Sequence, residues 1–198
     1  MTSGTLPTDQ MRSALVDAAS ALLTELGPEG LTVRNIAARA GSSTMLVYSR
    51  FGGKHGVVDA LYVEGFQRLS AAMRAGRTTK DPIADLRRCS RAYRKFAREN
   101  PTYYAVMFDR AVPDFEPSPE SSVIASGTLD VLGERVQRAI DAGMLPAEDP
   151  RQLAACLWSA NHGIVSLELK AVGPPDIDWA RRHTQVVNAM LAGLAASR

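Results

Sequence analysis

The segment LTVRNIAARAGSSTMLVYSRFGGK, residues 31–54, constrains the fold of this chain more than any other, because its spacing predicts two short helices joined by a tight turn. The Thr32 hydroxyl can cap the first helix, and Gly41 permits the left-handed backbone that ends it. Ser43 can cap a second helix that runs to about Phe51. The segment therefore predicts a helix-turn-helix.

The second helix of this segment is expected to leave an unusual set of side chains in solvent. Val47 and Phe51 lie one turn apart and should face the core. The opposite side then carries hydroxyl, thioether and aromatic groups, from Thr44, Met45, Tyr48 and Ser49. A short helix with such a face, flanked by Arg50 and Lys54, suits the major groove of DNA.

In a helix-turn-helix, the N-terminal half of the second helix lies nearest the base edges. Thr44 and Met45 are therefore the predicted base contacts, since a hydroxyl can bond several bases and a thioether can pack against a thymine methyl. The remaining candidates are placed for phosphate oxygens or, for the arginine, for a phosphate or a base edge: Thr32, Arg34, Ser43, Tyr48, Ser49 and Lys54. For Thr32 and Ser43, capping alone is the alternative.

Residues 14–66 resemble the DNA-binding domain of the tetracycline-repressor-like (TetR) transcriptional regulators, through T-V-R-N-I-A-A-R-A-G followed by S-T-M-L-V-Y-S-R-F-G-G-K. Residues 93–108 and the segment LWSANHGIVSLEL, with Trp158, His162 and Gly163, resemble the effector domains of the Trp-His-Gly subgroup of that family. The family pattern differs at the turn and at the start of the next helix, at Ser42, Gly53 and His55. The resemblance implies a homodimer that binds DNA and a four-helix bundle between its subunits.

The composition favours helices throughout the chain. Of its 198 residues, 45% are hydrophobic and only 6% aromatic, and no β-branched run alternates for long enough to form a strand. We therefore expect an all-α fold of about nine helices, with a Pro-rich and mobile loop at residues 111–120. The expected parts are a flexible tail at 1–8, a three-helix helix-turn-helix domain at 9–55, and an effector-binding and dimerisation domain at 56–198.

Charge is unevenly distributed along the chain, although the net charge is only +2. Residues 68–98 hold ten basic residues against two acidic ones, a local balance of +8. Four arginines repeat there at helical spacing: Arg87, Arg91, Arg94 and Arg98. This stripe is interpreted as a solvated helix face, with an anion-binding or DNA-flanking role as the alternative.

The second domain contains large apolar side chains with polar tips, as in small-molecule pockets. Trp158 and His162 lie four residues apart on one helix, and Tyr104 and Phe108 repeat that spacing on another. The predicted effector contacts are Tyr104, Met107, Phe108, Trp158 and His162. Ordinary core packing is the alternative for each of them.

The last two helices carry apolar stripes that predict a dimer interface, because a two-fold pair of helix-turn-helix units reads a palindrome. The predicted interface residues are Leu157, Ile164, Val165, Val186, Val187, Met190, Leu191 and Leu194. The same stripes can instead serve the core of the subunit itself. Two cysteines, Cys89 and Cys156, are expected to be free, buried thiols.

These features predict a ligand-responsive transcriptional regulator, a repressor that binds a near-palindromic double-stranded DNA operator as a homodimer and is released by a small apolar effector. A helical DNA-binding protein without a ligand is the alternative. An enzyme is disfavoured, since the three histidines lack metal-ligand spacing and no phosphate-binding Gly-rich loop or nucleophile elbow occurs. No metal, cofactor or membrane contact is expected, and the absence of a signal peptide predicts a cytoplasmic protein.

Overall fold

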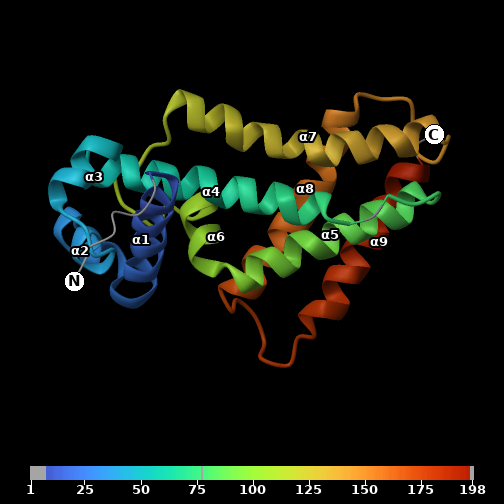
Figure 1. Ribbon diagram of the computed structural model, residues 1–198. Helices are drawn as coiled ribbons and strands as arrows, with labels where there is room; N and C mark the ends of the chain where they lie inside the picture. Colours follow the sequence, from blue (N-terminus) through green and yellow to red (C-terminus); the bar gives the residue numbers. More distant parts are fainter. Residues whose placement is uncertain (1–7, 77, 197–198) are drawn as a thin grey trace. The chain divides into compact units, whose positions relative to one another are not determined.

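The computed structural model describes residues 8–76 and 78–196, so the predicted tail lies outside the described residues except for Thr8 (Figure 1). The described residues form α-helices and no strand, which confirms the predicted all-α fold. In chain order these helices are α1 (Thr8–Gly30), α2 (Val33–Arg39), α3 (Thr44–Phe51), α4 (Lys54–Arg74), α5 (Pro82–Glu99), α6 (Pro101–Phe108), α7 (Pro119–Asp141), α8 (Pro150–Leu169) and α9 (Trp179–Ala196).

The helix ends follow local sequence signals. Gly27, with φ of 66°, interrupts α1, and Pro28 starts the short helical turn that follows. Asp81 and Asp149 cap α5 and α8, and a proline occupies the first turn of each.

The helices pack into two compact units. Unit 1 holds the described residues through Gly65 together with Thr102–Ser122. Its core is apolar and includes side chains of α1, α2, α3 and the first half of α4: Leu15, Val16, Ile36, Val47, Val57, Val58 and Leu61, all nearly inaccessible to solvent. Burial of these side chains fixes α2 against α1 and α3 against α2.

Within unit 1, the loop at residues 111–120 is anchored, and the expectation of a mobile loop is wrong. Val112 is buried, and the Phe115 ring lies 5.3 Å from the His55 ring and 5.8 Å from that of Tyr62. The Asp59 carboxylate accepts hydrogen bonds from the Ser118 backbone N–H at 3.0 Å and the Ser118 hydroxyl at 3.2 Å. The loop has apolar and polar partners on α4 that its composition does not reveal.

Unit 2 holds Phe66–Pro101 and the described residues from Val123 onward. In it, α8 and α9 pack on each other, and α5 packs on both. Asp85 is fully buried and accepts hydrogen bonds from Thr79, Arg88 and Arg138. Burial acts to raise the pKa of Asp85, but the bonds from Arg138 and Thr79 outweigh it and hold that pKa well below its usual range.

Candidate functional site

Side-chain caps and glycines define the helix-turn-helix segment, as the sequence predicts. The Thr32 hydroxyl accepts a hydrogen bond from the Asn35 N–H, and the Ser43 hydroxyl accepts one from the Leu46 N–H, each at 3.2 Å. Gly41 in the turn has φ of 62°, and Gly52, with φ of 70°, ends α3 in the left-handed conformation. The orientation of α3 is therefore set by local backbone chemistry.

Further contacts hold α2 against α1. Both guanidinium N–H groups of Arg39 donate to the Glu25 carboxylate at 2.6 Å, and the hydrogen bond lowers the pKa of Glu25. The Asn35 amide donates to the Gly30 carbonyl at 2.9 Å. Arg39 thus braces the segment through an ion pair, where the sequence indicates only a solvated charge.

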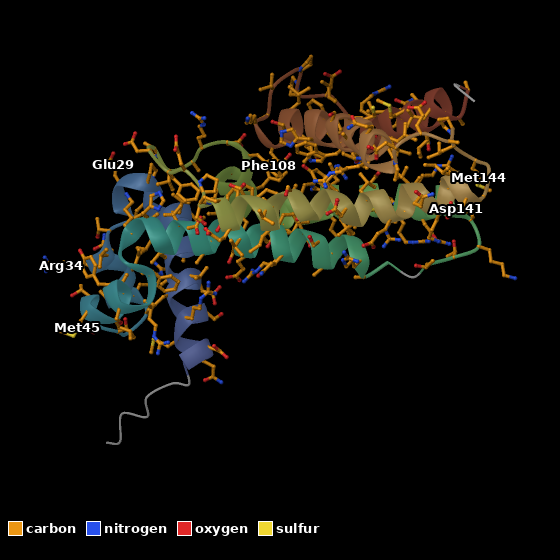
Figure 2. All side chains as sticks on the ribbon, turned by 90° about the horizontal axis from the view of Figure 1, so that it is seen from above. Glu29, Arg34, Met45, Phe108, Asp141 and Met144 are labelled. Carbon is orange, nitrogen blue, oxygen red and sulfur yellow. The ribbon has the colours of Figure 1, made fainter. Side chains whose placement is uncertain are left out.

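The outer face of α3 exposes the residues predicted to read DNA. Met45 is 79% exposed and Tyr48 58% exposed, whereas Val47 between them is inaccessible. Thr44 and Ser49 are also exposed. Figure 2 shows Met45 and Arg34 projecting away from the helices of unit 1. A large apolar side chain in solvent beside hydroxyl groups lacks a core function and matches what a DNA groove requires.

Lys54 is less available than its position in the sequence indicates. It is half-buried, and its ammonium group donates to the Pro28 carbonyl at 3.5 Å. The Ser49 hydroxyl donates to the Leu46 carbonyl at 3.1 Å, which leaves its oxygen able to accept. Arg34 carries its charge in solvent at the start of α2.

Two features that support the outer face of α3 were not predicted from the sequence. Gly53 is buried with φ of 128°, and a Cβ at this position would lie 3.4 Å from the Tyr48 ring. The Gly-Gly pair before Lys54 is the sequence feature that could have indicated this strained and buried position. The Arg12 guanidinium lies 5.6 Å from the centre of the Phe51 ring, which is a cation–π contact. Local residue spacing does not predict this contact.

The predicted effector contacts divide between the two units. In unit 1, Tyr104 is buried with its ring centre 4.8 Å from that of Phe108, and Met107 is buried beside Gly65. In unit 2, the Trp158 and His162 rings lie 5.8 Å apart. The Tyr93 hydroxyl lies 3.2 Å from Nδ1 of His162, so this histidine has the hydrogen-bond partner expected of a core residue.

Five of the predicted dimer contacts lie in the core of unit 2 and have little accessible surface in the single chain: Leu157, Ile164, Val165, Val187 and Leu191. Val186 is 37% exposed, and Met190 and Leu194 are half-buried. An apolar stripe predicts burial, and here the neighbouring helices of the same unit supply it.

A different face of α8 is open to solvent. Leu167 is 45% exposed, and three smaller residues extend the same side of the helix at near-regular spacing: Cys156, Ser159 and Gly163. Cys156 is therefore not the buried thiol that the sequence predicts, whereas Cys89 is buried and its pKa is raised to about 11 by that burial. No atom lies within 4 Å of a Cβ built on Gly163, so this glycine leaves room on the surface.

Other kinds of site have little support in the part of the chain that the structure describes. No three His, Cys, Asp or Glu side chains there are grouped to hold a metal ion. Among the same residues, no helix has both the length and the apolar composition to cross a bilayer.

Family models match both ends of the chain. Residues 15–61 match the model described as bacterial regulatory proteins, tetR family, and residues 86–194 match the tetracyclin repressor-like C-terminal domain. The second match does not confirm the Trp-His-Gly subgroup, which stays a prediction. No curated protein matches the chain.

Solved structures share the fold at low sequence identity. A protein of unknown function from Rhodococcus sp. RHA1 has a TM-score of 0.83 and 23% identity, over 98% of this chain and 100% of its own. The fatty acid degradation regulator FadR from Bacillus halodurans has a TM-score of 0.73 and 19% identity, over 96% and 98%. The TetR family transcriptional regulator PfmR from Thermus thermophilus has a TM-score of 0.66 and 21% identity, over 91% and 98%.

Proposed function

The chain belongs to the tetR family of bacterial regulatory proteins, and from that premise we propose that it is a ligand-responsive repressor that binds a near-palindromic operator as a homodimer. The observation that carries the proposal is the outer face of α3, where Met45 and Tyr48 stand in solvent on a helix fixed by caps at both ends. Maintaining such a face without a partner is unfavourable for a soluble protein.

In this proposal, Thr44 and Met45 contact base edges in the major groove, and the hydroxyl of Tyr48 bonds a phosphate. The remaining phosphate contacts come from groups around the two helix N-termini and the end of α3: Thr32, Arg34, Ser43, Ser49 and Lys54. The sequence-defined parts, 9–55 for DNA and 56–198 for effector and partner, are the functional division that goes with it. The protein would act in the cytoplasm.

The partner is proposed to be a second copy, seated on the exposed faces of α8 and α9. Leu167 and Val186 supply apolar area there, and Gly163 lets a helix approach closely. Two copies related by a two-fold axis would place two α3 helices on one DNA duplex, with half-sites about 34 to 36 Å apart or a multiple of that distance.

The effector is proposed to be a small apolar molecule with one or two polar groups. Trp158 and His162 of unit 2 are its proposed contacts, and the other residues predicted for the effector, Tyr104, Met107 and Phe108, belong to unit 1. Binding would shift α4 and with it the spacing of the recognition helices, which releases the DNA. An effector that contacts Trp158 changes tryptophan emission in a Trp179→Phe variant and leaves it unchanged in a Trp158→Phe variant.

The DNA claim is tested by selecting an operator from random duplexes with the full chain and titrating variants on it. Met45→Ala is expected to cost roughly 1 to 3 kcal/mol on the operator and to relax preference at one base pair per half-site. Met144→Ala is the matched control, because Met144 is a 37% exposed methionine of unit 2 (Figure 2). Equal losses on operator and random DNA, or no selected sequence, would show that α3 does not read bases.

A further inference from the structure

A pocket of about 130 Å³ lies between α5 and α9, and all of its lining residues belong to unit 2. Arg87 and Arg91 line it from α5. The opposite wall comes from α9 and consists of His183, Thr184, Val187 and Asn188. None of the proposed DNA, effector or dimer contacts is among these residues except Val187, which is buried.

The arginine stripe of α5 divides into two halves with different partners. Arg94 donates to the Glu168 carboxylate at 2.6 and 2.7 Å, and Arg98 lies 3.4 Å from the same carboxylate. Among the described residues, neither Arg87 nor Arg91 forms an ion pair. The nearest acid along α5, Asp85, is already held by Arg88 and Arg138.

The two arginines that form no ion pair with a described residue are also the two that line the pocket. The Nε of Arg87 donates to the Asn188 side-chain oxygen at 2.8 Å, which leaves the amide nitrogen of Asn188 as a further donor. No acidic residue lines the pocket. Arg87, Arg91 and Asn188 thus line one pocket, and none of its lining residues carries a negative charge.

The inner wall of the pocket is rigid. His183 is 2% exposed, and its Nε2 lies 3.0 Å from the side-chain oxygen of Asn161. The Asn161 amide donates to the Ser90 hydroxyl at 3.1 Å and to the Leu157 carbonyl at 2.8 Å, which fixes the histidine ring. Val187 adds an apolar wall, so the pocket is shaped for a group that is charged on one side and apolar on the other.

We propose that this pocket binds a small oxyanion, a carboxylate or phosphate group that carries at most a few carbon atoms, between Arg87, Arg91 and the Asn188 amide. Guanidinium groups match both oxyanions through paired N–H donors. The volume of about 130 Å³ is small beside the roughly 300 to 1,000 Å³ of pockets for drug-sized ligands, and it suits a single charged group. A bound anion would join α5 to α9 and stabilise the folded chain by mass action. The site is independent of the proposed DNA and effector functions.

The test uses the full chain with sodium phosphate, sodium acetate and sodium malonate, each compared with sodium chloride at equal ionic strength. Melting temperature and titration calorimetry report binding, and the His183 ring resonances report its place. At least one oxyanion is expected to raise the melting temperature above the chloride value and to shift His183. Arg91→Gln should weaken that binding by about tenfold or more, through loss of a charge-assisted hydrogen bond. Arg182→Gln, an exposed α9 arginine outside the pocket, should leave it within about twofold.

A second variant introduces into the wall of the pocket the negative charge that its lining residues lack. Asn188→Asp is isosteric and sets a carboxylate beside Arg87, so it should raise the melting temperature in chloride and abolish the response to the oxyanions. Phosphate binding alone, or carboxylate binding alone, would each support the site and identify its natural ligand class. No oxyanion effect in the wild type, equal losses in Arg91→Gln and Arg182→Gln, or binding without a His183 shift would each overturn the proposal.

Discussion

The outer faces of α3 and α8 both expose large apolar side chains, but their surroundings differ. On α3, Met45 and Tyr48 stand among hydroxyl groups, on a helix of eight residues that caps hold at each end. On α8, Leu167 continues a row of small side chains that includes Gly163, on a helix of 20 residues packed against α5 and α9. Similar exposure therefore suits two different partners. The face of α3, which mixes apolar and hydroxyl groups, suits base edges and phosphates, and the face of α8, which has small side chains, suits another helix.

The largest expected effect comes from placing charge on the α8 face. Gly163→Glu combined with Leu167→Glu should convert the proposed dimer into a folded monomer, because an uncompensated charge buried in an interface costs roughly 3 to 5 kcal/mol. Sedimentation equilibrium measures the assembly, and circular dichroism shows that the helices persist. Operator binding should fall with the loss of the dimer.

Two further variants separate the interface from the core. Gln152→Glu adds a charge at an exposed position near the start of α8 and should leave the assembly intact. Val187→Glu should unfold the subunit, since Val187 is 3% exposed within unit 2. A stable dimer of the double mutant would show that α8 is an ordinary surface.

The backbone under α3 gives the next largest effect. Gly53→Ala should destabilise the chain by about 1 to 3 kcal/mol, because an L-residue at φ of 128° is strained. Chemical denaturation measures the loss, and operator affinity should fall with it. Gly127→Ala on α7 is the control and should stabilise by about 0.5 to 1 kcal/mol, since its Cβ has open space. Equal effects at both positions would contradict the role of Gly53.

The contrast between these regions also explains what the sequence could predict. Helix ends depend on nearby groups, so Thr32, Gly41 and Ser43 could be identified from local spacing. Contacts between residues far apart in the sequence depend on tertiary packing, which the apolar stripe of one helix does not determine. Leu157 and Val187 illustrate the limit, because their apolar spacing predicts burial but not whether the same subunit or a second copy provides it.

The polar interior of unit 2 escaped sequence reasoning for the same reason. Asn161 lies on an apolar helix, yet it joins Ser90 and His183 in a buried hydrogen-bond network. Ser90, Asn161 and His183 come from three helices that are far apart in the sequence, and nothing in their spacing links them. Likewise, the sequence predicts that the arginine stripe is one solvated helix face. In the structure, Glu168 pairs with only half of its arginines.

Acid should affect the region around α8 and α9 more than the region around α3. Burial, and after it the charge of Arg94, holds the pKa of His183 below its ordinary value near 6.5. The unfolded chain therefore takes up this proton at higher pH than the folded chain, so the stability that the neutral ring contributes above pH 6.5 is lost as the pH falls below it. Hydrogen-exchange protection factors in α8 and α9, corrected for the pH dependence of intrinsic exchange, should fall between pH 7 and pH 5, with those in α2 and α3 changing less.

His183→Gln keeps an amide donor for Asn161 and should flatten that pH dependence. His55→Gln, which alters an exposed histidine of unit 1, should retain the wild-type profile. If exchange in α8 and α9 responds to pH equally in all three proteins, His183 does not couple protonation to folding.

The smallest expected effect distinguishes the two basic residues beside α3. Arg34 is exposed at the start of α2, so Arg34→Ala should weaken binding equally on all sequences and lower the salt slope of log affinity by about 0.9 per half-site. Lys54 is half-buried, and its ammonium group must leave the Pro28 carbonyl before it can reach a phosphate, so Lys54→Ala should lower the slope by less. Titration of the selected operator over a range of salt concentrations measures both slopes. A larger change for Lys54 than for Arg34 would mean that the lysine turns toward DNA on binding, and that the face of α3 is completed by its partner instead of being preformed.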